Sequence, residues 1–142
     1  MVVRLELYAT GGAPPEDTWA VVSDLRRLPE WTDAEEVERV EPEPVAPGTE
    51  FVVVRGDDRR LWRVMTAEPR LLEVTTQTPR GPLAIGVRVV RDPYGSRLVL
   101  AGAYDPPCRR DALRVRAIDA PALRRRFDRW SRAALRLAAA VR

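Results

Sequence analysis

Residues 48–104 alternate apolar and polar side chains almost without interruption, which is the period of a half-buried β-strand. Five segments carry the alternation: GTEFVVVRG, RRLWRVMTA, LLEVTTQT, PLAIGVRVV and SRLVLAGAY. The breaks between them, GDD, EP, PRG and DPYG, are short and rich in turn-forming residues. Because connections this short join antiparallel neighbours, we predict an antiparallel meander over this whole region.

The N-terminal part predicts one strand, two short helices and an edge strand. VVRLELYA at 2–9 alternates like the meander, and GGA breaks it. PPEDTWAVVSDL predicts a helix, since proline and acids suit a first turn. DLRRLPEW then predicts a second helical turn that ends near Pro29. The acidic stretch DAEEVERVEPEP predicts an exposed edge strand and loop, because such dense like charge resists burial.

A long amphipathic helix is predicted over 121–141, with Asp119 or Ala120 as its cap and Pro121 at its first position. One face carries Leu123, Phe127, Trp130, Ala134, Leu137 and Val141 at helical spacing. The other side carries Arg124, Arg125, Arg129, Arg132 and Arg136. Before it, DPPCRRDALRVRAIDA predicts a short helix that is kinked ahead of Pro121.

Composition limits the chemistry. The chain has no histidine and no lysine, which excludes Ser-His-Asp, Cys-His and HExxH sites and Schiff-base catalysis. Its single cysteine, Cys108, can form no intrachain disulfide, and no Walker or GxGxxG sequence is present. We therefore expect no metal and no cofactor. Without a signal peptide or an apolar run of membrane-spanning length, we expect a cytoplasmic protein.

Charge is divided unevenly along the chain. Residues 1–58 carry 5 arginines against 14 acids, and residues 59–142 carry 19 arginines against 7 acids. We interpret this as a fold whose two halves attract each other electrostatically. A basic surface for an acidic partner is the alternative interpretation.

The order of strand, two short helices, six strands and long helix resembles the SRPBCC superfamily. This group includes START lipid-transfer domains, birch-pollen-allergen-like proteins, and bacterial polyketide cyclases and aromatases. The residues that carry the resemblance are Ala13-Pro14-Pro15, Thr18-Trp19, Asp24, Pro29-Glu30-Trp31 and Gly48-Thr49. The resemblance implies an α+β helix-grip fold over a single domain, 1–142. In this fold a curved seven-stranded antiparallel sheet wraps the C-terminal helix, with two short helices after the first strand.

The resemblance also implies a cavity between the helix and the concave face of the sheet, closed at one side by the two short helices. Strand alternation then places Thr66 and Thr76 inward, in phase with the apolar residues before them. The candidate ligand-binding residues are Trp31, Phe51, Val53, Arg55, Trp62, Thr76, Ile85, Val87, Leu100, Tyr104, Phe127 and Trp130.

Each polar or aromatic candidate has a purely structural alternative. Trp31, Trp62 and Trp130 could simply pack in the core. Arg55 either enters the cavity or lies at a strand end, where Asp57 and Asp58 could pair with it. Tyr104 could donate to a ligand or to the backbone.

Three functions remain open. The first is binding of a small hydrophobic or amphipathic ligand, lipid- or polyketide-like, whose polar end Arg55, Thr76 and Tyr104 orient. The second is a polyketide cyclase, aromatase or dehydratase with Tyr104 as proton donor and Arg55 as enolate stabiliser. Glu50 and Glu73 fall on the outward phase and offer it no carboxylate.

The third function is macromolecule binding through the arginines of the C-terminal helix. Nucleic acid is not an expected partner, because no aromatic residue is interleaved among them. A monomer and a homodimer both remain open.

Overall fold

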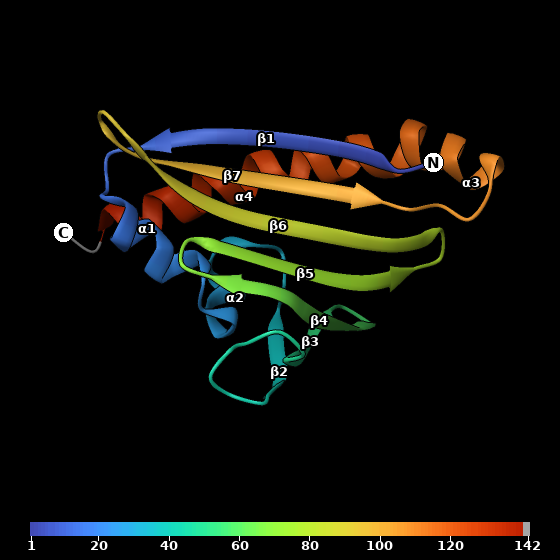
Figure 1. The fold of residues 1–142 in the computed structure, drawn as a ribbon, viewed down its shortest axis with the longest axis horizontal. Helices are drawn as coiled ribbons and strands as arrows, with labels where there is room; N and C mark the ends of the chain where they lie inside the picture. The colour runs from blue at the N-terminus through green and yellow to red at the C-terminus, as the bar shows by residue number, and fades with distance from the viewer. Residues whose placement is uncertain (141–142) are drawn as a thin grey trace.

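A single antiparallel sheet organises the molecule, for which the computed structural model describes residues 1–140 (Figure 1). Its seven strands lie in the order β1-β7-β6-β5-β4-β3-β2, so the segments from β2 to β7 form a meander and β1 pairs with the last strand. The strands are β1 (Val3–Gly11), β2 (Glu36–Glu41), β3 (Glu50–Arg55), β4 (Asp58–Glu68), β5 (Leu71–Thr78), β6 (Gly81–Asp92) and β7 (Gly95–Tyr104). The predicted meander, acidic edge strand and seven-stranded α+β fold are confirmed.

Two short helical segments follow β1, as predicted. The helix α1 (Pro15–Val22) carries its proline and acids in the first turn. A 3₁₀ turn, Leu25–Arg27, begins where the Asp24 side chain accepts a hydrogen bond from the Arg26 N–H, and α2 (Leu28–Trp31) continues it. The prediction that the second helical turn ends near Pro29 was wrong, because α2 continues to Trp31. Pro29 lies in the first turn of α2, where its missing N–H costs no helical hydrogen bond.

The C-terminal region is one continuous helical rod. It begins with α3 (Arg109–Arg114), passes through a π-helical turn (Val115–Asp119) and continues as α4 (Ala120–Ala140). The predicted short helix before Pro121 is confirmed as α3, whereas the predicted helix start at Pro121 was wrong, because the helical backbone continues through this position. The Ala120 N–H donates to the Val115 carbonyl, and this wider turn precedes the proline, whose ring would crowd a regular α-helical turn. Val141, placed on the apolar face, lies outside the described residues.

The helix α4 packs behind β1 and β7, while α1 and α2 cover one end of the sheet (Figure 1). Leu123 and Phe127 approach the sheet most closely at Gly102. A Cβ there would lie 3.0 Å from Leu123 Cδ2 and 3.4 Å from the Phe127 ring. Because this β7 residue has no side chain, the fully buried Leu123 and Phe127 side chains lie directly on the backbone of the sheet.

Strand alternation holds along the sheet apart from two register shifts, one in β2 between Glu38 and Glu41 and one in β4. On β7 every second residue from Ser96 to Tyr104 is buried. On β4 the register with β5 shifts between Val64 and Thr66, so Thr66 lies opposite the exposed Glu73. The prediction that Thr66 faces inward was wrong, because a bulge at this point reverses the phase of every later residue on the strand.

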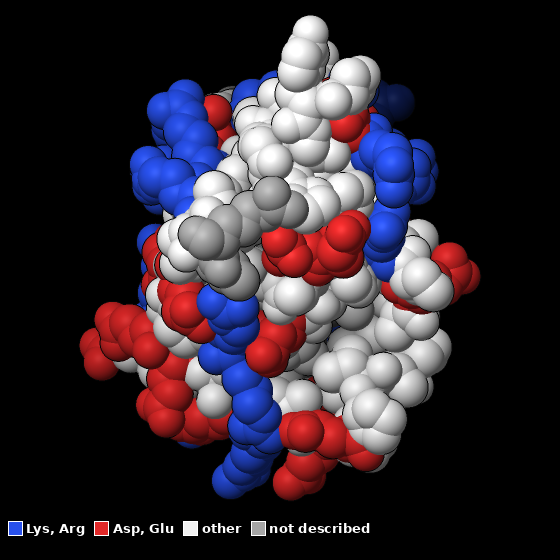
Figure 2. Space-filling view, turned by 90° about the vertical axis from the view of Figure 1, so that its left-hand side faces the viewer, with Lys and Arg blue, Asp and Glu red and all other residues white. Residues whose placement is uncertain are grey.

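Ion pairs join the acidic and basic parts of the sequence, as predicted. Arg63 pairs with Glu50 at 3.1 Å, and Arg59 pairs with Glu38, both between neighbouring strands. Figure 2 shows acidic side chains gathered in the lower half of one end face, beside a column of basic side chains. Most of these pairs are exposed and contribute little stability each.

A buried hydroxyl pair ties α1 to the sheet. Thr18 Oγ1 and Ser96 Oγ lie 2.7 Å apart, and both residues are fully buried. We expect Ser96→Ala to lower the free energy of unfolding by about 1–3 kcal/mol, because the Thr18 hydroxyl keeps its desolvation cost and loses its partner. Urea denaturation measures the change. Adding Thr18→Val should recover part of the loss, whereas fully additive losses would contradict the coupling.

Candidate functional site

A cavity of about 110 Å³, open to solvent on one side, lies between the concave face of the sheet and the helices. Its walls come from the 3₁₀ turn, from α1, α2 and α4, and from strands β3 to β7. The lining residues are Val22, Leu25, Leu28, Trp31, Thr32, Asp33, Ala34, Phe51, Val53, Arg55, Trp62, Leu72, Val74, Ile85, Val87, Leu100, Arg126 and Trp130. Most of these residues are apolar, so the cavity favours an apolar group of a ligand.

Aromatic rings form two opposite walls of the cavity. On the helical side, Trp31 and Trp130 meet edge to face, with ring centroids 6.4 Å apart and planes at 90°. On the sheet side, Phe51 and Trp62 are stacked, with centroids 6.5 Å apart. Such rings offer both faces and edges to a flat molecule placed between them.

Two buried indole N–H donors of the cavity lining have no acceptor among the described residues. These are the Nε1 atoms of Trp31 and Trp130. Trp31 is 4% exposed, so the N–H has been removed from water without compensation. An unpaired buried donor costs about 1–3 kcal/mol, and an oxygen atom of a bound molecule could recover that cost.

Three ionisable side chains line the cavity where it meets solvent. Asp33 follows α2, Arg55 ends β3 and Arg126 lies on α4. Asp33 Oδ2 lies 3.2 Å from Arg126 Nε and 3.3 Å from Arg55 Nη2. One hydrogen bond joins these groups: Arg126 Nη2 donates to Asp33 Oδ1 at 3.4 Å. The two contacts to Asp33 Oδ2 are ion pairs without hydrogen-bond geometry. We call these three residues the mouth cluster.

The structure brings together nine of the twelve predicted residues. Those that line the cavity are Trp31, Phe51, Val53, Arg55, Trp62, Ile85, Val87, Leu100 and Trp130. Arg55 lies at the end of its strand and also at the cavity, and its partner is Asp33 rather than the predicted Asp57 or Asp58. Thr76, Tyr104 and Phe127 do not line it.

These three residues have other contacts. The Thr76 hydroxyl donates to the Leu61 carbonyl at 2.6 Å. Phe127 is fully buried against Gly102. Tyr104 is buried at the end of β7, beyond the cavity lining; burial, and secondarily the nearby Asp119 carboxylate, raises the pKa of its phenol, which therefore stays protonated at neutral pH.

Sequence reasoning missed Asp33 and Arg126. Asp33 follows Trp31 in the loop after α2, where no periodicity predicts the direction of a side chain. Arg126 precedes Phe127 and lies between the two faces of α4, with its guanidinium 4.9 Å from the centre of the Trp130 ring. Its spacing of four residues from Trp130 was the available signal.

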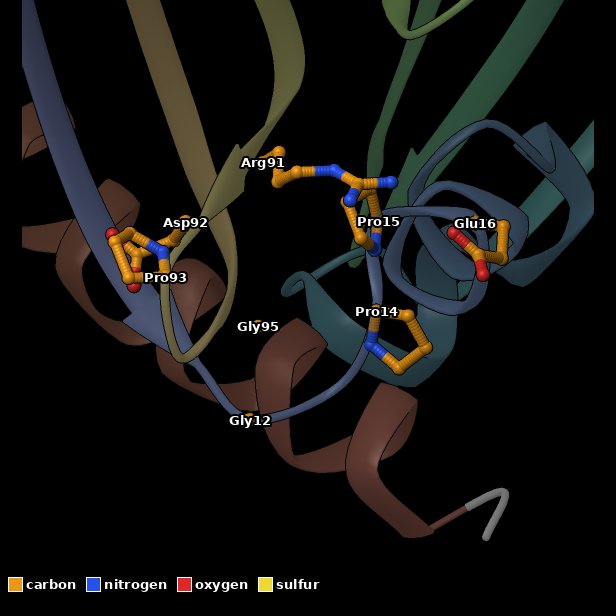
Figure 3. Close-up of a pocket in the computed structure, with 8 residues that line it drawn as sticks. All are labelled: Gly12, Pro14, Pro15, Glu16, Arg91, Asp92, Pro93 and Gly95. Atoms are coloured by element: carbon orange, nitrogen blue, oxygen red, sulfur yellow. The ribbon is translucent and has the colours of Figure 1, made fainter.

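A larger hollow of about 590 Å³ opens between the β1–α1 loop and the β6–β7 hairpin (Figure 3). Its lining consists of Gly12, Pro14, Pro15, Glu16, Arg91, Asp92, Pro93 and Gly95. The Arg91 side chain reaches from β6 toward Pro15 across this space (Figure 3). Because this hollow is more open to solvent and offers fewer apolar side chains, we choose the smaller cavity between the sheet and the helices as the candidate site.

Other functional features were searched for over residues 1–140. No group of three or more histidine, cysteine or acidic residues within that range could hold a metal ion. No helix there is long and apolar enough to cross a membrane. The five arginines predicted on the outer side of α4 are all exposed, and Arg132 pairs with Asp128 at 2.8 Å. Binding of a macromolecule by this surface stays a prediction.

The sequence matches one protein family over nearly its whole length. Residues 4–141 match the family described as polyketide cyclase/dehydrase and lipid transport. A search of curated proteins gave no match.

Solved structures share the fold. The Zhui aromatase/cyclase from Streptomyces sp. R1128 is 17% identical, with 97% of this chain and 94% of that chain covered and a TM-score of 0.73. Ara h 8.0201 is 13% identical, with 99% of each chain covered and a TM-score of 0.69. A protein from Rhodobacter sphaeroides is 25% identical, with 98% and 94% covered and a TM-score of 0.69.

Proposed function

The chain belongs to the polyketide cyclase/dehydrase and lipid transport family of the SRPBCC superfamily, and we propose that it binds a small amphipathic molecule in the cavity between the sheet and α4. The observation that carries this proposal is the mostly apolar cavity with aromatic rings on its helical side and on its sheet side. A core without a ligand gains contacts by closing such a space.

The size of the cavity limits what enters it. Its volume of about 110 Å³ is below the range of roughly 300–1,000 Å³ that is usual for drug-sized ligands. An engineered apolar cavity of about 150 Å³ binds benzene, so the cavity volume here suits about one ring or a short alkyl segment. The remainder of the molecule would lie at the mouth cluster.

The unpaired indole N–H groups favour a ligand that carries an oxygen acceptor. The donors of Trp31 and Trp130 both belong to lining residues, and a carbonyl or ether oxygen would satisfy either one. A pure hydrocarbon would leave them unpaired. We therefore propose an amphipathic rather than a wholly apolar ligand.

Binding is better supported than turnover. A cyclase needs an acid or base within hydrogen-bond reach of the substrate. Tyr104 is not among the lining residues, and the carboxylate that does line the cavity, Asp33, is held between two guanidinium groups. We accordingly propose a binding protein and assign no reaction.

A titration with 3-phenylpropan-1-ol tests the proposal. Its phenyl ring matches the cavity volume, and its hydroxyl oxygen can accept a hydrogen bond from an indole N–H. Three of the chain's four tryptophans line the cavity, so we expect a saturable change in tryptophan fluorescence. Isothermal calorimetry should give one site per chain with a negative heat-capacity change, since apolar surface is buried. A linear, non-saturating response would contradict the proposal.

A further inference from the structure

The ionisable groups of the cavity are unbalanced in charge. Within the described part of the chain, Asp33, Arg55 and Arg126 are the only ionisable residues of the lining, and together they carry one net positive charge. They come from three separate elements, so they surround the mouth instead of forming a row along one helix or strand. A ligand whose polar end reaches the mouth therefore meets a positive site.

The two arginines of the mouth cluster are not equivalent. Arg126 donates one hydrogen bond from Nη2 to Asp33 Oδ1 at 3.4 Å, its Nε lies 3.2 Å from Oδ2 as an ion pair, and its guanidinium lies over the Trp130 ring. Arg55 has one contact with Asp33, at 3.3 Å, and its side chain is 53% exposed. Because a guanidinium has five N–H donors in a planar fork, Arg55 keeps most of its donors for a second anion.

Asp33 makes the mouth selective. Its carboxylate neutralises one guanidinium. Arg55 can form two parallel hydrogen bonds with a second carboxylate, whereas it has only one contact with Asp33. An incoming acid could take that position, while a neutral head gains less and an ammonium head is repelled by the net charge. The half-exposed position of Arg55 keeps the desolvation cost of such a pair modest.

We propose that the ligand is a compact acid, with an apolar ring or chain in the cavity and a carboxylate on Arg55. This inference rests on the proposed function, since it concerns the polar end of the same bound molecule. The carboxylate would lie at the mouth, next to the ring of Trp130 that Arg126 covers.

Three probes with one apolar body test the inference: 3-phenylpropanoate, 3-phenylpropan-1-ol and 3-phenylpropylamine. We expect the acid to bind about tenfold more tightly than the alcohol, as for one charge-assisted hydrogen-bonded pair, and the amine to bind most weakly. Equal Kd values for acid and alcohol would overturn the inference and leave the proposed function standing. Failure of all three probes to bind would overturn both.

Two substitutions with opposite expected signs sharpen the test. Arg55→Gln removes the free guanidinium, so the preference for acid over alcohol should fall toward one. Asp33→Asn removes the competing carboxylate, so the same preference should rise by at least about threefold. A change in the same direction for both variants would contradict the inference, because a general loosening of the mouth would produce it.

Arg63→Gln is the matched control for surface charge. Arg63 is exposed to a similar extent as Arg55, lies on the adjacent strand and pairs with Glu50, but it does not line the cavity. We expect this variant to keep the wild-type ratio of the two Kd values. A fall equal to that of Arg55→Gln would show that overall charge attracts the acid, and the inference would fail.

Discussion

We expect Val74→Phe to abolish binding of 3-phenylpropan-1-ol, with a Kd at least about tenfold higher than that of the wild-type protein. Val74 lines the cavity from β5 and packs against both parts of the hydrophobic core. A phenyl group at this position would occupy much of the 110 Å³ that the ligand needs. Fluorescence titration and calorimetry measure the loss.

The added ring should cost little stability, because it enters space that is empty in the structure rather than a closely packed core. Val99→Phe is the matched control, since Val99 lies on the opposite phase of β7 and does not line the cavity. Its affinity should equal that of the wild-type protein. If Val74→Phe is folded and still binds the probe normally, the ligand does not enter this cavity.

Phe127→Ala should have the largest effect on stability, a loss of about 3–5 kcal/mol in the free energy of unfolding. Phe127 is fully buried between α4 and the sheet, where its ring contacts the backbone at Gly102. The substitution removes that apolar contact and leaves a cavity that the helix and sheet cannot close completely. Urea denaturation measures the loss.

Because typical domains have only about 5–15 kcal/mol in total, this variant could unfold, and Phe127→Leu provides a milder second measurement with a smaller loss expected. Leu113→Ala is the control, since Leu113 is 69% exposed and should change stability little. We also propose that residues 1–142 unfold as one domain. A single transition supports this proposal, and a loss below about 1 kcal/mol for Phe127→Ala would contradict the assigned core position.

The sequence predicted the sheet well because alternation and turn residues are local signals. The segments of the meander, the acidic edge strand and the inward phase of Phe51, Ile85 and Leu100 all follow from a period of two. The same reasoning failed at Thr66, where a bulge that depends on pairing with β5 reversed the phase. Pairing partners are not encoded in the pattern of one strand.

Phase alone also could not say how far along the sheet the cavity extends. Thr76 and Tyr104 are buried, as an inward phase predicts, but they lie outside the cavity lining. The mouth cluster could not be predicted from the sequence for a different reason. Asp33 lies in a loop and Arg126 at the boundary of a helical face, and only the tertiary fold brings them together with Arg55.

The position of a bound probe tests the central claim most directly. In a nuclear magnetic resonance experiment on the complex with 3-phenylpropan-1-ol, we expect intermolecular nuclear Overhauser effects from the ring protons to the methyl groups of Val74, Ile85 and Leu100. These three residues line the cavity from three neighbouring strands. Effects confined to outward methyl groups, such as those of Val99, would contradict a ligand held between the sheet and α4.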